Sequence, residues 1–190
     1  MIERSPIVLA AVLWTAVSAG NAAGSTGNRA LDAIQAVTAL RHGDVGHVDS
    51  RTLARWLRDL PREVLLLDAR EPAEYAVSHL PGAVRVSPDM TAEAFVARFG
   101  DRIEGRRIVI YCSVGVRSTG LGSRIGDVAR EAGAVSVVNL TGGIFNWHNE
   151  RRPLVAASGP TERIHPYSEL WGRLLERRAL ISYGPEAAAE

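Results

Sequence analysis

One stretch of the chain decides the fold: Ile108-Val109-Ile110-Tyr111-Cys112-Ser113-Val114-Gly115-Val116-Arg117-Ser118. Its apolar, mostly β-branched beginning predicts a buried strand over residues 107–111 that ends at the thiol of Cys112. A loop around Gly115 follows, and a helical pattern then runs from Arg117 to Ala132. Backbone N–H groups and the positive end of a helix dipole converge at such a loop. They favour thiolate over thiol, so we interpret Cys112 as a nucleophile, although a free cysteine is often only a small buried hydrophobe.

The composition is ordinary for a globular protein, because 46% of the 190 residues are hydrophobic and 23% are charged. The formal net charge of +1 gives no broad attraction to nucleic acid, so no nucleic-acid partner is predicted. All 22 residues of the Lys+Arg count are arginine, which excludes a lysine base or Schiff base. Cys112 is the only cysteine, which excludes an internal disulfide, a CxxC redox pair and a cysteine-based zinc site. Nothing in the sequence implies a metal or an organic cofactor.

The first 24 residues have the order of a secretory signal peptide. Arg4 precedes an apolar run from Ile7 to Val17, and small residues follow. This run is shorter than the roughly 20 residues of a spanning helix. The pattern predicts a periplasmic or secreted protein, with an uncleaved membrane anchor or a cytoplasmic helix as alternatives. A weak association with a membrane through this segment is the corresponding partner prediction. Residues 25–44 are interpreted as a linker and an N-terminal helix over 30–40.

Strand patterns alternate with helical patterns between residues 45 and 155, the predicted main domain. The strands are expected at 63–68, 83–86, 107–111 and 134–138. The helices are expected at 50–60 with Ser50 as N-cap, at 71–77, at 91–99 with Thr91 as N-cap, at 117–132, and after Thr141-Gly142-Gly143. This alternation predicts an α/β fold with a parallel sheet covered on both faces. Ligands bind such sheets beyond the carboxyl ends of the strands, so Asp68 and Cys112 are expected at one edge.

A different pattern follows in residues 156–190. Residues 156–160 are predicted to form a linker. Residues 167–175 are predicted to form an amphipathic helix with Leu170, Trp171 and Leu174 on one side. This helix is expected to pack back on the domain, or else to rest on a partner or a membrane surface. Residues 185–190 are expected to be disordered.

Four segments carry a family resemblance. They are Leu66-Leu67-Asp68-Ala69-Arg70-Glu71-Pro72-Ala73-Glu74-Tyr75, Ser78-His79-Leu80-Pro81-Gly82-Ala83, Cys112 to Ser118, and Leu140-Thr141-Gly142-Gly143-Ile144-Phe145-Asn146-Trp147. Together, in this order and at this spacing, they resemble the rhodanese-like family of single-domain thiosulfate sulfurtransferases. Ser78 stands where that family usually has glycine. The resemblance implies a three-layer fold in which a five-stranded parallel sheet has helices on both faces.

The resemblance also implies an activity. Active members take a sulfane sulfur from a donor such as thiosulfate, hold it as a cysteine persulfide and pass it to cyanide, a thiol or a protein. Cys112 matches the sulfur-carrying position. The loop residues Ser113, Val114, Gly115, Val116, Arg117 and Ser118 are then expected to bind the persulfide and the substrate. The aliphatic Val114 and Val116 make the rim of this loop less polar than one rich in arginine.

Two roles remain open for several of these residues. Arg117 either shields the negative sulfur or ties the loop to a carboxylate such as Asp68. Ser118 is expected to cap the helix, or else to bond the sulfur. Three further residues are expected to support the site. Asp68 is expected to anchor loop N–H groups, and Arg70 to form an ion pair or to line the pocket mouth. His79 is expected to make a structural hydrogen bond or to act as a base.

Two other functions remain as alternatives. A cell-cycle type phosphatase or an arsenate reductase uses a similar cysteine, but its loop holds five residues between cysteine and arginine. Residues 113–116 supply only four here, which makes a smaller cradle that suits one sulfur. The second alternative is a non-catalytic module that carries sulfur or binds a partner. The retained Cys112, Gly115 and Arg117 favour a competent enzyme.

Overall fold

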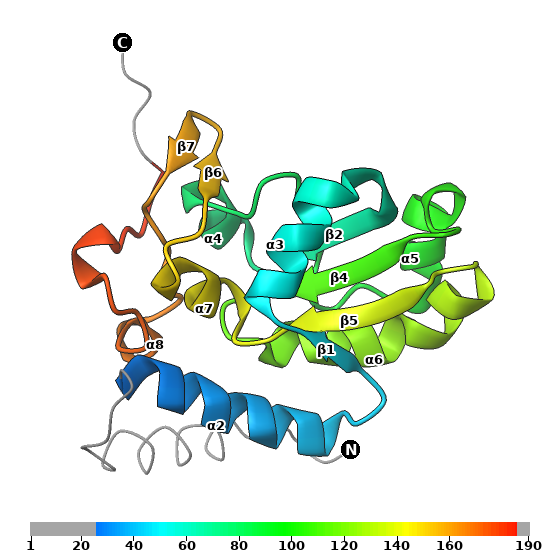
Figure 1. Ribbon diagram of the computed structural model, residues 1–190, viewed down its shortest axis with the longest axis horizontal. Helices are drawn as coiled ribbons and strands as arrows, with labels where there is room; N and C mark the ends of the chain where they lie inside the picture. The colour runs from blue at the N-terminus through cyan, green and yellow to red at the C-terminus, as the bar shows by residue number, and fades with distance from the viewer. Residues whose placement is uncertain (1–25, 186–190) are drawn as a thin grey trace.

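The computed structural model describes residues 26–185 and shows a mixed α/β fold around a five-stranded parallel sheet (Figure 1). The strand order is β1-β5-β4-β2-β3, and a separate antiparallel hairpin pairs β6 with β7. The strands are β1 (Gly46–Val48), β2 (Val64–Asp68), β3 (Val84–Arg85), β4 (Arg107–Tyr111), β5 (Ser136–Leu140), β6 (Leu154–Ala156) and β7 (Gly159–Thr161). The helices are α2 (Thr26–Arg41), α3 (Ser50–Asp59), α4 (Pro72–Val77), α5 (Ala92–Phe99), α6 (Val116–Glu131), α7 (Gly143–Asn149) and α8 (Glu169–Gly172), with 3₁₀ turns at Pro61–Glu63, Gly100–Arg102 and Arg178–Leu180.

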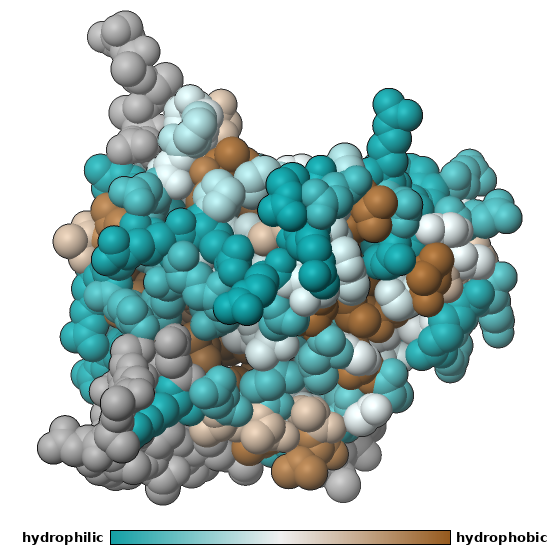
Figure 2. Space-filling view, in the orientation of Figure 1, coloured by the Kyte–Doolittle hydropathy of each residue, from teal (hydrophilic) through white to brown (hydrophobic). Residues whose placement is uncertain are grey.

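Successive side chains of β2 and β4 point to opposite faces of the sheet and are buried in two separate cores. Leu66 and Val109 face a core that includes residues of α2, α3, α7 and the C-terminal segment. Leu65 and Ile110 face a second core that α5 and α6 complete. Strands buried on both faces read as continuous apolar runs, which is why the pattern predicted β2 and β4 well. On the face that Figure 2 shows, hydrophobic residues form small separate groups in a mostly hydrophilic surface.

The parallel register brings the predicted site residues to one edge. Asp68 pairs with Tyr111 across β2 and β4, so the residues that follow these two strands emerge side by side. The predicted three-layer fold is therefore confirmed, including the fifth strand that only the family resemblance implied. That strand, β1, escaped the pattern because it has three residues, of which only Val48 is buried.

Several boundaries differ from the prediction: α2 begins at Thr26, inside the predicted linker, and two further differences lie in the main domain. Asp49, not Ser50, caps α3: its carboxylate accepts the N–H of Thr52 at 2.9 Å, and Ser50 is the first helical residue. The strand predicted at 134–138 lies at 136–140, because Gly133 turns the chain with a φ of +87° and Val135 is 58% exposed. The later register places Asn139 at the functional edge.

The C-terminal segment also differs. Residues 156–160, predicted as a linker, form the end of β6, the turn and the start of β7 in a hairpin that crosses the predicted domain boundary at 155. The helix predicted over 167–175 is reduced to the four residues of α8. Leu174 is 1% exposed and belongs to the first core, so this segment packs on the domain, whereas Leu170 is 45% exposed.

The predicted signal peptide lies outside the described residues, as does the tail predicted as disordered over 185–190 apart from Pro185. Within residues 26–185, no helix is both long enough and apolar enough to cross a membrane.

Candidate active site

Cys112 follows β4 directly and is 1% exposed. The loop after it turns back so that the N–H of Gly115 donates to Cys112 Sγ at 3.2 Å. Gly115 is the N-cap of α6 and has a φ of +101°. The backbone angle favours glycine, and a Cβ at this position would also press on Nδ2 of Asn139 at 3.0 Å. Ser118, predicted as the cap, lies instead inside the first turn of α6.

The start of α7 fixes the other side of the loop. The N–H of Ile144 donates to the carbonyl of Cys112 at 2.9 Å, and the N–H of Phe145 donates to that of Ser113 at 3.1 Å. These are donors that the first turn of a helix leaves unpaired. The two loop carbonyls therefore have partners in α7, while the N–H of Gly115 donates to the sulfur of Cys112. Two helix N-termini, those of α6 and α7, thus shape one short loop.

Opposing influences act on the thiol. Burial raises the pKa of Cys112, but the charge of Arg117, the hydroxyl and N–H of Ser118, and the N–H of Val114 together hold it below the usual range. The lowered pKa increases the thiolate fraction near neutral pH. The arrangement therefore supplies a nucleophilic sulfur in an anion-stabilising cradle.

Arg117 is held by Glu74, not by Asp68 as one reading of the sequence suggested. Its Nη1 and Nη2 donate to the two carboxylate oxygens of Glu74 at 2.8 and 2.9 Å. Its Nη2 also donates to Ser113 Oγ at 2.9 Å, and Ser113 Oγ donates to Glu74 at 2.7 Å. The centroid of the Tyr167 ring lies 4.8 Å from the guanidinium carbon, so the ring stacks over the guanidinium. Arg117 is thus enclosed by groups from three separate parts of the chain.

Asp68 is committed to Arg70. Both side chains are fully buried, and Arg70 donates to the carboxylate through Nε at 2.9 Å and Nη2 at 2.7 Å. The carboxylate also accepts the N–H of Arg70, and Arg70 Nη2 donates to the carbonyl of Ser78 at 2.6 Å. Arg70 therefore forms an internal ion pair and does not line a pocket mouth.

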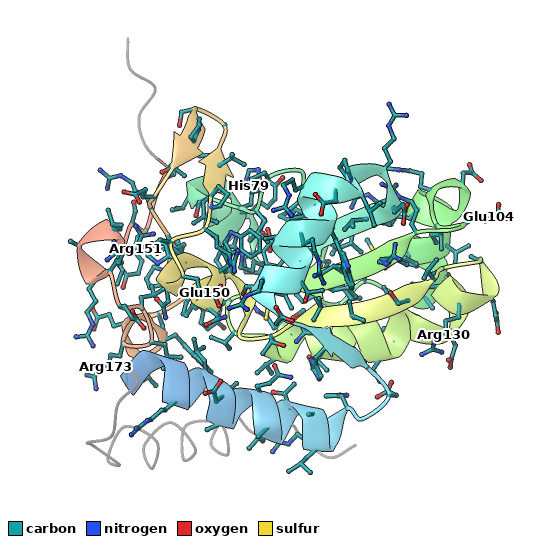
Figure 3. The ribbon with its side chains drawn as sticks, viewed as in Figure 1. His79, Glu104, Arg130, Glu150, Arg151 and Arg173 are labelled. Atoms are coloured by element: carbon teal, nitrogen blue, oxygen red, sulfur yellow. The ribbon has the colours of Figure 1, made fainter. Side chains whose placement is uncertain are left out.

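His79 makes contacts of a structural kind. Its Nδ1 lies 3.1 Å from the carbonyl of Tyr75, and the two rings stack with centroids 3.8 Å apart. Its backbone pairs with Val155 of β6, so it joins α4 to the hairpin (Figure 3). None of these contacts is with the loop of Cys112.

The family model of the rhodanese-like domain matches residues 51–150 of this chain. The protein belongs to the rhodanese-like family. This match includes all of the loop, β2, α4 and α7, whereas α2 and the segment that carries Tyr167 lie outside it.

Relatives of this rhodanese-like protein carry several names. A sulfurtransferase of Allochromatium vinosum is 33% identical over 115 residues, which are 60% of this chain and 99% of that protein. A tRNA uridine(34) hydroxylase of Burkholderia pseudomallei is 32% identical over 114 residues, but the match covers only 37% of it. A thiosulfate sulfurtransferase structure from Pseudomonas aeruginosa has a TM-score of 0.51 and 25% identity, over 76% of this chain and 26% of that one. Together, the family and the sulfurtransferase relatives support a rhodanese-type sulfurtransferase.

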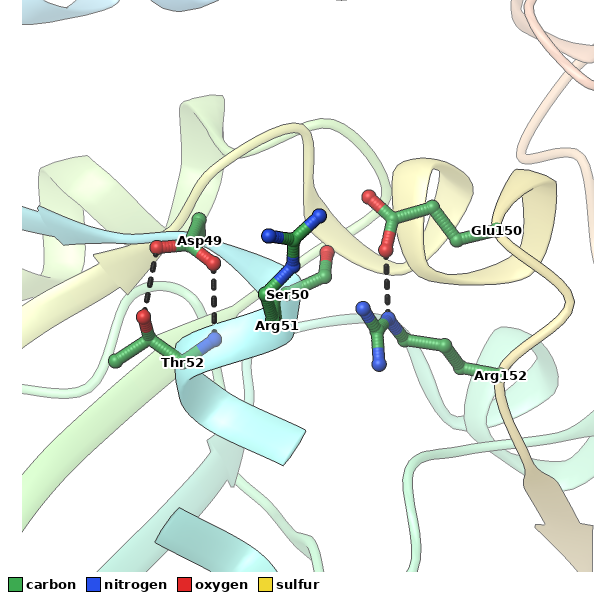
Figure 4. Close-up of a pocket in the computed structure, with 6 residues that line it drawn as sticks. All are labelled: Asp49, Ser50, Arg51, Thr52, Glu150 and Arg152. Atoms are coloured by element: carbon green, nitrogen blue, oxygen red, sulfur yellow. Dashed lines mark hydrogen bonds and ion pairs between the residues drawn. The ribbon is translucent and has the colours of Figure 1, made fainter. Parts of the chain in front are cut away.

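A polar groove lies elsewhere on the rhodanese-like domain. It is lined by Asp49, Ser50, Arg51, Thr52, Glu150 and Arg152 (Figure 4). Its charges are largely satisfied within the groove, since Asp49 accepts from Thr52 and Arg152 donates to Glu150 at 2.6 Å. No residue of the Cys112 loop lines it, so the groove is separate from the chemistry.

Three residues of the site escaped the sequence analysis as functional candidates. Glu74 was visible only as the acid of the Glu-Tyr motif, and that motif does not show which arginine it meets. Asn139, whose Oδ1 accepts from Ser118 Oγ at 2.6 Å, was hidden by the register error in β5. No sequence pattern indicated Tyr167. Its own backbone is left-handed (φ +65°), and its N–H donates to His165 Nδ1 at 3.0 Å, which sets its position.

The Arg117→Ala variant is expected to shift the pH profile of Cys112 alkylation by iodoacetamide to higher pH. Arg117 lowers the pKa of Cys112, so its loss leaves less thiolate at neutral pH and slows alkylation roughly three- to tenfold there. The Arg107→Ala variant is the control, because Arg107 pairs with Glu63 at the opposite end of the strands. An Arg117→Ala profile that coincides with that of the wild type would show that Arg117 does not act on the thiol.

Proposed function

We propose that the protein transfers sulfur from thiosulfate or a similar sulfane donor to an external acceptor through a persulfide on Cys112. The observation that carries the proposal is the buried thiol with a lowered pKa, held in a loop whose N–H groups face the sulfur. This arrangement suits both the attacking thiolate and the negative persulfide that replaces it.

The first step is a displacement at sulfur. The thiolate of Cys112 attacks the outer sulfur of thiosulfate, a new S–S bond forms, and the old S–S bond breaks as sulfite leaves with its electron pair. The product is a persulfide anion on Cys112, so the charge balances without a proton or an added oxidant. The loop N–H groups, including that of Ser118, stabilise the negative sulfur.

The second step needs an acceptor from outside the chain. A nucleophile such as cyanide, a thiol or a protein thiol attacks the terminal sulfur, and Cys112 leaves as a thiolate. Because the sequence has one cysteine, no second thiol of this chain can take the sulfur. The acceptor therefore has to reach the loop itself.

The alternatives are less well supported. A phosphatase or arsenate reductase needs the loop arginine to clamp a tetrahedral anion, and here Glu74 occupies two guanidinium nitrogens of Arg117. A purely non-catalytic module does not need a cysteine with a lowered pKa in a fully formed cradle.

The test is thiocyanate formation from thiosulfate and cyanide. The wild type is expected to turn over, and the Cys112→Ser variant is expected to fall to the uncatalysed background, because a serine hydroxyl cannot hold a sulfane sulfur. Circular dichroism and thermal unfolding of both proteins provide the control for folding. Equal turnover by wild type and a folded Cys112→Ser variant would contradict the proposal.

A further inference from the structure

Glu74 is a carboxylate built into the active site without a place in the mechanism above. It comes from α4, its side chain is 2% exposed, and both of its oxygens accept from Arg117. Burial raises the pKa of Glu74, but Arg117, Ser113 and the N–H of Glu71 lower it further, so the group stays ionised. A buried negative charge therefore lies directly against the one arginine of the loop.

The groups around this pair do not restore a positive charge. Glu71 lies 3.9 Å from Arg117 Nη1, with its side chain 55% exposed, and adds a second negative charge at the rim. The charges of Asp68 and Arg70 cancel in their own buried pair. His165 is buried, which is the main reason that its pKa is lowered, so it is neutral near pH 7. Val114 and Val116 contribute apolar side chains to the loop.

The net effect concerns the charge of the donor. Arg117 still acts on the adjacent thiol, but an arginine paired with Glu74 attracts an incoming dianion less strongly than an arginine without a partner would. The ring of Tyr167 also lies over the guanidinium and restricts access to that face of it. The site thus contains Arg117, which attracts anions, together with Glu74 and Tyr167, which weaken that attraction.

We propose that Glu74 is a specificity-determining residue, which neutralises Arg117 and biases the site toward singly charged or neutral sulfane donors over dianionic thiosulfate. This inference rests on the proposed sulfur transfer through Cys112. It concerns which donor loads the cysteine and leaves the chemistry of the loading step unchanged.

Two probes of the same chemistry differ by one charge. Thiosulfate carries two negative charges and releases sulfite. Methanethiosulfonate carries one negative charge and releases methanesulfinate. In both reactions the thiolate of Cys112 forms one S–S bond, the donor's S–S bond breaks, and the leaving group takes the electron pair.

The experiment compares the second-order rate of sulfur loading with the two donors in wild type and Glu74→Gln. Glutamine keeps the size of the side chain and is accepted at this position of the capping box that α4 forms with Glu71. Loss of one negative charge beside the donor is expected to raise kcat/KM for thiosulfate about tenfold and that for methanethiosulfonate about threefold, at low salt. The change in the ratio of the two rates between wild type and Glu74→Gln is the quantity compared, because the intrinsic reactivity of each donor cancels in it.

The control is Glu63→Gln, which also removes a carboxylate from an arginine pair but lies at the opposite end of the strands. Its donor ratio is expected to equal that of the wild type. An unchanged or reduced thiosulfate preference in folded Glu74→Gln would overturn the inference about Glu74. Failure of both donors to load the wild type would overturn the proposed function, so the two failures are distinguishable.

Discussion

Replacing Gly143 by alanine is expected to lower the free energy of unfolding by about 3–5 kcal/mol and to disrupt the loop of Cys112. Gly143 has a φ of +58°, in the region that residues with a Cβ rarely adopt. A Cβ there would overlap the carbonyl oxygen of Cys112 and lie 2.6 Å from that of Ser113. These are the two carbonyls that the start of α7 holds, so the chain cannot relax without moving the loop. Urea unfolding and alkylation of Cys112 measure the two effects.

Gly82→Ala separates the strain of the backbone from the clash. Gly82 also has a positive φ, +78°, but an added Cβ would meet nothing within 4 Å. Only the conformational cost of about 1–2 kcal/mol is expected, with normal reactivity of Cys112. If Gly143→Ala costs no more than Gly82→Ala, the close packing of α7 against the loop does not position the thiol.

Replacing Asp68 by alanine is expected to destabilise the protein by about 3–5 kcal/mol, because it leaves the fully buried charge of Arg70 without its carboxylate. The change also removes the acceptor for the N–H of Arg70, where the chain leaves β2. Thermal and urea unfolding measure the loss.

The matched control is Asp59→Ala. Asp59 pairs with Arg58 at 2.8 Å, but both side chains are largely exposed, so no measurable loss is expected. A loss for Asp68→Ala no greater than that for Asp59→Ala would show that the Asp68–Arg70 pair is not a structural anchor of the functional edge.

The sequence predicted those parts of the fold that depend on local pattern. The runs that form β2 and β4 are largely apolar because both of their faces are buried. The change from strand to helix at Gly115 is predicted by the residues directly around it. Short edge elements carry little such signal. The strand β1 buries one side chain of three, and the β6–β7 hairpin turns at the small residues Ala157 and Ser158, which are equally typical of a linker.

The pairing of charges was the least predictable part of the site. Asp68 and Glu74 both lie near the functional edge, and Arg70 and Arg117 are both within reach of it. Arg70 is two residues from Asp68, so its backbone N–H and its guanidinium can meet the same carboxylate. Because Asp68 pairs with Arg70, Glu74 is left to pair with Arg117. This pairing depends on the conformation of the turn after β2 and does not follow from the residue types.

The most direct test of the account is the intact mass of the protein after incubation with thiosulfate or methanethiosulfonate and removal of the donor. We expect the wild type to gain one sulfur atom, located on the peptide that contains Cys112 and removed by cyanide, and Cys112→Ser to gain none. A wild-type protein that gains no sulfur from either donor, or a Cys112→Ser variant that gains the same adduct, would contradict it.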